Sequence, residues 1–273
     1  MSATEERSYV LGTEDAELVR LGNQHQTWVQ ACYDLFARAG LRTGDRVLDL
    51  GCGPGFTTME LARLVGPTGS VVAIDQSQRF LDHLAAVARH AGTTWARPLA
   101  AQLEHVDLPP ASFDAAYSRW LFCWLTDAEP ALANTVRALR PGGALLLHEY
   151  LHWGSMRLVP ECPAFARAVQ GCMASWPASG ATIDFAMQVP SIAERHGLRI
   201  EHFAPIARLG AVGSLEWRWL TEFFANYLPK LVDRELLTGP EVDAALTSLR
   251  ERTTRGLGYC YTPTVAAVVL RKP

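Results

Sequence analysis

Two short segments carry residues whose types and spacing suit the binding of a small ligand. Residues 47–55 read VLDLGCGPG. An apolar run that contains one acid is thus followed by a turn in which every second residue is glycine. The apolar run predicts a strand, and the apolar spacing that follows predicts a helix over 55–65. A glycine turn between strand and helix lets the backbone approach a ligand at the carboxyl end of a parallel strand. We therefore expect ligand binding by the backbone, with Asp49 beside it.

The second segment supplies a carboxylate at a spacing from the glycine turn that suits a ribose. Residues 70–74 read SVVAI and predict a second strand, which ends in Asp75. In open α/β sheets an acid about 20 residues beyond such a turn binds ribose hydroxyls. An ionised carboxylate has acceptor sites for both hydroxyl donors. The ligand is therefore expected to contain a ribose.

The glycine spacing argues against a dinucleotide. The dinucleotide fingerprint needs a third glycine where this chain has Phe56. Pro54 also removes a backbone N–H of the kind that binds a pyrophosphate. An NAD-linked oxidoreductase is therefore disfavoured.

Two further segments complete an ordered set of four. Residues 107–118 read DLPPASFDAAYS and predict a strand with its lead-in, and residues 139–143 read LRPGG before the apolar run 144–147. In this order the four segments resemble the motifs of class I S-adenosylmethionine-dependent methyltransferases, over residues 40–150. The resemblance implies S-adenosylmethionine as cofactor and a Rossmann-like α/β fold: a doubly wound, seven-stranded, mostly parallel sheet with helical lid insertions.

The resemblance also implies roles for individual residues at the cofactor. Asp49 would face the ammonium group, Asp75 the ribose, and Gln76 the adenine edge. Many relatives bind the adenine amino group with an acid where this chain has Gln102, whose side-chain carbonyl can accept the same hydrogen, followed by Leu103. The cofactor-binding candidates are Asp49, Gly51, Gly53, Gly55, Asp75, Gln76, Gln102, Leu103, Ser118 (through its backbone carbonyl) and Gln24.

Methyl transfer needs an aligned acceptor, excluded water and, for some acceptors, a base. Residues 148–153 read HEYLHW, the densest group of titratable side chains in the chain. In an extended segment His148, Tyr150 and His152 would share one side, with Glu149 on the other. Glu149 or His152 is a candidate general base and Tyr150 a candidate orienting donor. His148 is expected to be a buried core histidine.

Other residues are expected around the reacting atoms. Tyr9, Gln24 and His25 are candidates to close over the positive sulfonium, for which a tyrosine ring is a favourable neighbour. Arg119, Trp120 and Trp124 follow the fourth strand and are expected to line the same pocket. The catalytic candidates are Glu149, Tyr150, His152, Tyr9 and His25.

Periodicity and turn residues divide the chain into elements. Helices are expected over 14–39, 78–91 and 128–139, and later strands near 198–208 and 258–270. Thr126 and Glu129 are spaced as a capping box, and another helix is expected to begin at Thr238. We expect an N-terminal helical lid (1–40), a methyltransferase core (41–210) with an insertion at about 151–181, a helical cap (211–255) and a final core strand (256–273).

Composition restricts the partners and the compartment. The 273 residues are 49% hydrophobic and 19% charged, with a formal net charge of −3, so the basic stripe of a nucleic-acid partner is not expected. The sequence has no signal pattern and no apolar run that could span a bilayer, so we expect a cytoplasmic protein with no membrane partner. The six cysteines form no C-x-x-C pair, so no metal site is expected. The sequence leaves open whether the chain forms a homodimer.

The expected substrate is a small aromatic molecule. The aromatic residues of the 211–255 segment suit a pocket for a flat apolar ligand. The chain also resembles methyltransferases of bacterial secondary metabolism, which implies transfer to an aromatic or indole-like natural product, at carbon or nitrogen. The alternatives are O-methylation of a phenol or quinol and a non-catalytic subunit with the methyltransferase fold.

Overall fold

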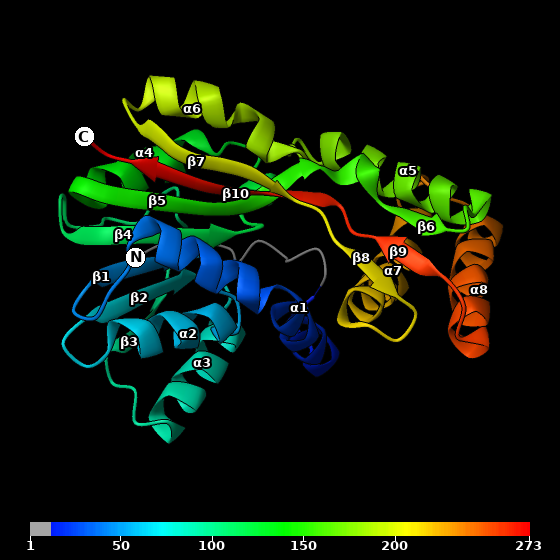
Figure 1. Ribbon diagram of the computed structural model, residues 1–273, viewed down its shortest axis with the longest axis horizontal. Coiled ribbons are helices and arrows are strands. Elements are labelled where there is room, and N and C mark those ends of the chain that lie inside the picture. The colour runs from blue at the N-terminus through cyan, green and yellow to red at the C-terminus, as the bar shows by residue number, and fades with distance from the viewer. Residues whose placement is uncertain (1–11) are drawn as a thin grey trace.

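The computed structural model describes residues 12–273 and is built around one seven-stranded sheet (Figure 1). Its strands are β1 (Arg46–Leu50), β2 (Ser70–Asp75), β3 (Ala96–Ala100), β4 (Phe113–Arg119), β5 (Leu139–His152), β7 (Arg199–Ile206) and β10 (Thr264–Arg271). The order is β3-β2-β1-β4-β5-β10-β7, and β10 alone runs antiparallel to its neighbours. The order reverses between β1 and β4, which is where ligands bind in such sheets. The predicted fold class is confirmed.

Helices cover both faces of the sheet because parallel strands need crossover connections. One face carries α1 (Asp15–Ala39), α2 (Phe56–Val65) and α3 (Gln78–His90), and the other carries α4 (Glu129–Ala138) and α6 (Val189–Arg195). Val47 and Leu146 face the first group, whereas Leu48 and Leu147 face the second. Successive strand residues thus alternate between two apolar layers, as the pleat requires.

A smaller lobe, on the right in Figure 1, is formed by a three-stranded antiparallel sheet and three helices. The strands are β6 (Arg157–Val159), β8 (Leu209–Ala211) and β9 (Tyr259–Tyr261), in the order β6-β9-β8, and the helices are α5 (Pro163–Ala178), α7 (Leu215–Val232) and α8 (Gly239–Arg255). Leu158, Gly210 and Cys260, one from each strand, are buried. Three one-turn helices complete the structure: η1 (Phe122–Trp124), η2 (Trp153–Ser155) and η3 (Phe185–Gln188).

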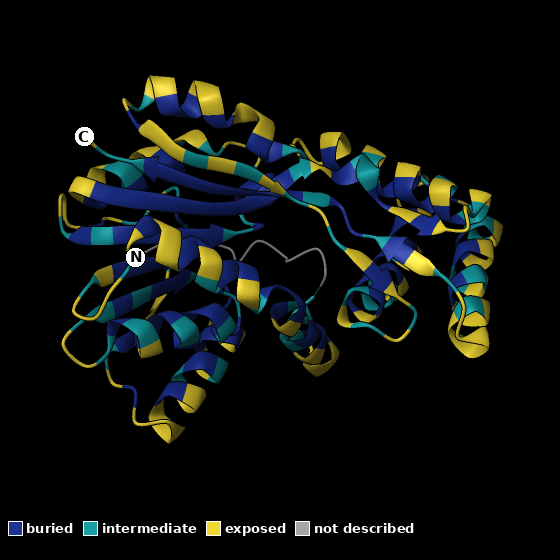
Figure 2. Cartoon of the chain, viewed as in Figure 1, coloured by how far each residue is buried: buried dark blue, intermediate teal, exposed yellow. Residues whose placement is uncertain are grey.

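Burial is concentrated in the central strands. Figure 2 shows β4, β10 and the part of β5 that pairs with them largely buried, whereas β7 at the sheet edge alternates between exposed and partly buried residues. The central strands that carry the pocket are therefore buried.

The helix predictions for the core are confirmed to within one residue for α1, α2, α3 and α4. The capping box expected at Thr126 is wrong, because α4 begins after Ala128 and the Glu129 N–H donates to Asp127 Oδ1 at 3.0 Å. A capping box is present instead at the start of α8, between Thr238 and Glu241.

The expected single strand over 258–270 is two strands that serve two sheets. β9 belongs to the small sheet and β10 to the central sheet, and Pro263 lies between them. Proline has no backbone N–H and cannot continue a strand ladder there. The small sheet was not expected from the sequence, because its strands have only three residues each.

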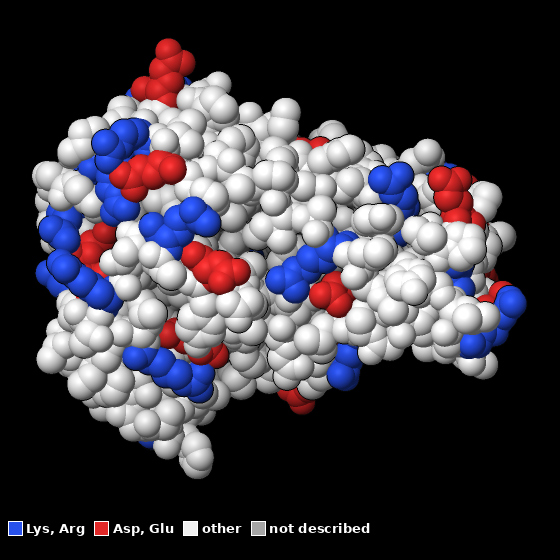
Figure 3. Space-filling model, in the orientation of Figure 1, with Lys and Arg blue, Asp and Glu red and all other residues white. Residues whose placement is uncertain are grey.

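The described residues also show how charge is distributed on the surface and whether a membrane helix or a metal site is present. Basic and acidic side chains are interspersed on the face drawn in Figure 3. Within residues 12–273, no helix has the length and apolar character needed to cross a membrane, and no three His, Cys, Asp or Glu side chains are grouped as a metal site requires.

Candidate active site

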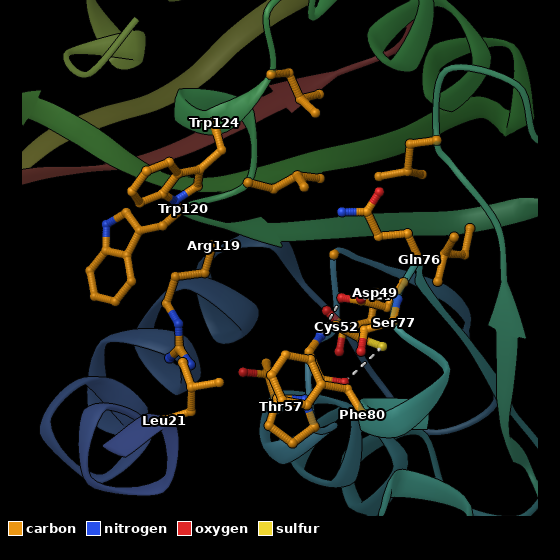
Figure 4. Close-up of a pocket in the computed structure, with 18 of the residues that line it drawn as sticks. Leu21, Asp49, Cys52, Thr57, Gln76, Ser77, Phe80, Arg119, Trp120 and Trp124 are labelled. Carbon is orange, nitrogen blue, oxygen red and sulfur yellow. Dashed lines mark hydrogen bonds between the residues drawn. The ribbon is translucent and has the colours of Figure 1, made fainter. Parts of the chain in front are cut away.

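A pocket of about 300 Å³ lies at the carboxyl ends of β1, β2 and β4. This volume is at the lower end of the range for small-ligand sites. Figure 4 shows Asp49, Cys52 and Ser77 on one side of the pocket, with Trp120 and Trp124 on the other. The pocket therefore has a polar end at the glycine turn and an aromatic end beyond β4.

Gly53 and Gly55 have different functions in the glycine turn. Both have left-handed backbone angles, with φ of 53° and 86°. Gly53 lines the pocket, and a Cβ there would meet no atom within 4 Å, so the turn is open toward a ligand at this position. A Cβ on Gly55 would collide with the Leu84 side chain of α3. Gly55 does not line the pocket, so its expected approach to the cofactor is corrected to a role in helix packing. Gly51 lines the pocket as expected.

Asp75 is held at the end of β2 by two backbone N–H groups. Its Oδ2 accepts a hydrogen bond of 2.8 Å from Gly53, and its Oδ1 accepts one of 2.9 Å from Ser77. These bonds connect the carboxylate to the glycine turn and to the start of α3. Asp75 lines the pocket, and a carboxylate is an acceptor of the kind that ribose hydroxyls require.

Asp49 is buried beneath the turn but reaches the pocket, with 2% of its surface exposed. Thr58 Oγ1 donates a hydrogen bond of 2.6 Å to its Oδ2. Burial raises the pKa of Asp49 to about 6, although Thr58 and Arg119 both lower it. An ammonium group that approached Asp49 would favour the ionised carboxylate.

The pocket surface next to Asp75 suits a flat heterocycle. The apolar side chains of Ile74, Phe80 and Leu103 line it, together with the amides of Gln76 and Gln102. Ser77 Oγ also lies here, buried and without a hydrogen-bond partner among the described residues. Buried hydroxyls of this kind are normally satisfied, so this one indicates a ligand contact. With Asp75 and the open Gly53, these residues fit the adenosine and amino-acid parts of S-adenosylmethionine.

The aromatic end is a stack of rings. Trp120 stacks on Tyr150 of β5 with centroids 5.3 Å apart, and on Trp219 of α7 at 5.6 Å. Trp120 has a φ of 52°, which is uncommon for a bulky residue. Its backbone N–H donates to the His148 carbonyl at 2.9 Å, which holds this strained turn in place. Backbone strain of this kind is typical of functional sites.

Glu149 faces away from the pocket, which corrects its assignment as a general base. It is fully buried, and its Oε1 accepts hydrogen bonds of 3.0 Å from the N–H groups of Leu121 and Phe122. Its Oε2 accepts one of 3.4 Å from Cys123. Burial raises the pKa of Glu149 to about 7, although the three N–H groups lower it. Glu149 is therefore a positioning residue for the turn that carries the aromatic wall.

The two histidines among the catalytic candidates, His25 and His152, also lie outside the pocket. His25 stacks behind Phe56, with centroids 5.8 Å apart, and its Nε2 lies 3.6 Å from Glu60 Oε1. His152 is exposed beyond the end of the β5–β10 pairing, where the register shifts. Neither side chain lines the pocket, so neither is placed to act on a substrate.

The remaining candidates are distributed as follows. Tyr150 lines the pocket, whereas Ser118 is fully buried in β4 and does not. Tyr9 lies outside the described residues. The expectation for His148 is confirmed: it is a buried core histidine, 3.1 Å from the Tyr117 hydroxyl, and burial lowers its pKa to about 3.

Gln24 of α1 lines the pocket with a fixed orientation. Its Oε1 accepts hydrogen bonds of 3.0 Å from Arg20 Nη1 and from Trp219 Nε1. Both partners are donors only, so the amide oxygen must point toward them. The amide NH₂ group is left as a donor for a ligand.

The sequence indicated part of the lining and missed part of it. Arg119, Trp120 and Trp124 line the pocket, as expected. Phe223, from the aromatic-rich 211–255 segment that was expected to suit a flat ligand, also lines the pocket. Arg20 and Phe80 line it too and were not expected as site residues, because nothing in the sequence near them marked them.

The comparisons with known proteins agree with this geometry. Residues 47–143 match the family model described as "Methyltransferase domain". The chain is 32% identical, over 136 aligned residues, to the ubiquinone/menaquinone biosynthesis C-methyltransferase UbiE of Saccharophagus degradans. The aligned region covers 48% of this chain and 52% of that protein. The chain thus spans about half the length of the curated relatives it matches.

Solved structures share the fold. The geranyl diphosphate C-methyltransferase of Streptomyces coelicolor, in complex with S-adenosyl-L-homocysteine, superposes with a TM-score of 0.57 at 14% identity, over 93% of this chain and 84% of that one. The [4+2]-cyclase SpnF has a TM-score of 0.57 at 20% identity, over 89% and 81% of the two chains. Likeness at these identities shows the fold alone, and the fold does not determine the reaction.

The matched region contains most of the residues that were expected to bind the cofactor. The glycine turn, Asp75, β4 and the first residues of β5 all fall within residues 47–143. The pocket, with Asp75 and Gly53 in its lining, lies where the sheet order reverses. Residues 47–143 of this chain thus resemble a methyltransferase domain, and the pocket lies at the carboxyl ends of strands within that segment.

Proposed function

We propose that the chain transfers a methyl group from S-adenosylmethionine to a ring carbon of a small, flat, oxygenated aromatic acceptor. The observation that carries this proposal is the continuity of one pocket from Asp75 to the stacked rings of Trp120 and Tyr150. A cofactor at Asp75 and a flat acceptor against the rings would share one cavity. In-line displacement requires this proximity.

The aromatic wall suits the charges of this reaction. S-adenosylmethionine supplies a methyl group on a positively charged sulfur, which activates it toward nucleophiles. Both faces of Trp120 are covered, by Tyr150 and Trp219, so the rings available to positive charge are others of the pocket lining, such as Tyr150 and Phe223. Their π-electrons favour positive charge, both on that sulfur and on a ring carbon as it is alkylated. Phe223 and Trp124 add apolar surface that excludes water from the reacting atoms.

Gln24 is the residue that we assign to an oxygen substituent of the acceptor. Its NH₂ group is directed away from Arg20 and Trp219, and the residue lines the pocket. A hydroxyl or carbonyl oxygen on the acceptor would accept from it. Such a donor orients the ring and stabilises negative charge on the oxygen.

Two observations favour carbon over oxygen as the methylated atom. Methylation of a phenol oxygen is aided by a base at that oxygen, and among the described residues no histidine lines the pocket and Glu149 is occupied by backbone N–H groups. Methylation of a ring carbon releases the ring proton only after the new carbon–carbon bond has formed. The cationic ring is then a strong acid, and water or a carboxylate of the pocket lining can accept this proton. The curated relatives are named C-methyltransferases, which supports the same choice. A quinol-like or hydroxyindole acceptor combines a flat ring, an oxygen and an electron-rich carbon.

The test is methyl transfer by the purified full chain from S-adenosylmethionine labelled with ¹³C in the methyl group. A naphthoquinol, a hydroxyindole and a simple phenol would be offered as acceptors, with the Asp75→Asn variant as the control. Carbon NMR of the product distinguishes a methyl group on a ring carbon from one on nitrogen or oxygen. Ring methylation supports the proposal. A product methylated on oxygen or nitrogen, or no transfer to any acceptor, contradicts it.

A further inference from the structure

The guanidinium group of Arg119 is a positive charge in the pocket wall that the proposed chemistry does not use. Arg119 is the last residue of β4, is partly buried and lines the pocket. Its Nη1 lies 3.3 Å from Cys32 Sγ, and its Nη2 lies 3.5 Å from His25 Nδ1. Of the ion pairs within residues 12–273, none includes Arg119.

Within residues 12–273, Arg119 thus has no carboxylate in ion-pair contact, and its guanidinium carbon lies 5.5 Å from the centroid of the Trp120 ring. A thiol sulfur is a weak acceptor, and a guanidinium has five N–H donors. Arg20, in the same pocket wall, has instead a bidentate ion pair with Glu17, with both N···O distances at 2.7 Å. A charge that is taken from water without a partner is costly, so such groups are usually paired. An anionic ligand group in the pocket would supply the missing partner of Arg119.

The position of Arg119 relative to Asp49 indicates which anion this is. Figure 4 shows the Arg119 side chain running from β4 toward Leu21, across the pocket from Asp49. The two charges interact electrostatically, and both belong to the pocket lining. The amino-acid end of a ligand carries a carboxylate and an ammonium group on one carbon. A guanidinium and a carboxylate on opposite sides of a pocket match that pair of charges.

We infer that Arg119 binds a ligand carboxylate, and that this is the carboxylate of the cofactor's amino-acid end, with Asp49 at its ammonium group. The inference rests on the proposed use of S-adenosylmethionine. The planar fork of arginine suits bidentate binding of a carboxylate. Cys32 and His25, both on α1, then act as positioning residues that direct the fork into the pocket.

The test compares two ligands and two arginine variants by calorimetry. The ligands are S-adenosylhomocysteine and its decarboxylated analogue, which keeps the ammonium group and lacks only the carboxylate. Arg119→Gln should weaken binding of S-adenosylhomocysteine by about 10- to 100-fold, the range for hydrogen bonds to charged groups. Wild type and variant should bind the decarboxylated analogue equally. Arg119→Lys keeps the charge but lacks the planar fork, so its affinity for S-adenosylhomocysteine should lie between those of wild type and Arg119→Gln.

The control is Arg97→Gln, which removes an exposed arginine on β3 and should change neither affinity. Equal weakening of both ligands by Arg119→Gln would mean a structural role and would overturn the inference. Unchanged binding of S-adenosylhomocysteine would also overturn it, and a raised KM for a carboxylated acceptor would then assign the anion to the substrate. Failure of the wild-type chain to bind S-adenosylhomocysteine would count instead against the proposed function.

Discussion

The buried carboxylate of Glu149 on β5 accepts a hydrogen bond of 3.0 Å from the backbone N–H of Phe122, in the turn that follows β4. Leu121 and Cys123 donate to the same carboxylate, so one side chain satisfies three consecutive amides. The same turn begins with Trp120 at its strained backbone angle. The acid in the most titratable segment of the sequence therefore supports the pocket wall and does not act on the substrate.

Replacement of Glu149 by Gln should destabilise the protein in a pH-dependent way. The amide NH₂ would face the Cys123 N–H donor, which costs about 1–3 kcal/mol. Folding raises the pKa of this carboxyl from 4.5 to about 7, so its contribution to stability is fully present below 4.5 and is lost as pH rises toward 7. The free energy of unfolding of the variant should therefore fall further below that of wild type at pH 5 than at pH 8, as measured by urea unfolding.

The control for this measurement is Glu161→Gln, at an exposed position before α5. Its free energy of unfolding should differ from that of wild type by the same small amount at pH 5 and at pH 8. A Glu149→Gln deficit that does not change with pH would show that this carboxyl does not titrate between the two values.

Asp75→Ala should weaken binding of S-adenosylhomocysteine by about 10- to 100-fold, because charged hydrogen bonds to the ribose are lost. The Gly53 and Ser77 N–H groups line the pocket and can bind water in its place, so the fold should persist. Calorimetry and circular dichroism measure the two effects. Asp107→Ala, at a side chain that is 98% exposed, is the matched control. Equal affinity for wild type and Asp75→Ala would remove the ribose role.

The two glycines of the turn should respond differently to alanine. At both positions the left-handed backbone costs about 1–2 kcal/mol with a Cβ. Gly55→Ala should cost about 1–3 kcal/mol more, because the Cβ collides with Leu84. Gly53→Ala should instead lower the affinity for S-adenosylhomocysteine, since its Cβ has free space only in the ligand site. Thermal unfolding and calorimetry on both variants check this, and the reverse pattern would contradict the assigned functions.

Gln24→Leu should lower kcat/KM for an oxygenated acceptor by about 10-fold, the effect of one lost hydrogen bond to a partly charged oxygen. Binding of S-adenosylhomocysteine should change little, because the donor is assigned to the acceptor. Steady-state kinetics and calorimetry separate the two. Gln30→Leu, which removes an exposed glutamine of the same helix, serves as control. If the loss fell on S-adenosylhomocysteine binding alone, Gln24 would be a cofactor residue.

The elements of the core could be predicted because their signals are local. The apolar spacing of α1 and the strand–turn–helix order around Gly53 each lie within one continuous segment. Asp75 could be placed for the same reason, since a strand end and its distance from the turn are properties of the sequence.

The positions of Glu149, His25 and His152 could not be predicted because they depend on neighbours distant in sequence. Glu149 faces away from the pocket because the turn after β4 presents three N–H groups to it. His25 is separated from the pocket by Phe56, from another helix, and His152 lies where the β5–β10 register shifts. Gln24 owes its orientation to Trp219, 195 residues away.

The most direct test of the account is calorimetric titration of the purified, folded chain with S-adenosylmethionine and S-adenosylhomocysteine, with NAD as the comparison ligand. We predict saturable binding of both adenosyl ligands in the micromolar range and none of NAD, since Phe56 and Pro54 disfavour a pyrophosphate. Binding of NAD, or no binding of either adenosyl ligand by a folded sample, would contradict the assignment of this pocket to a methyl donor.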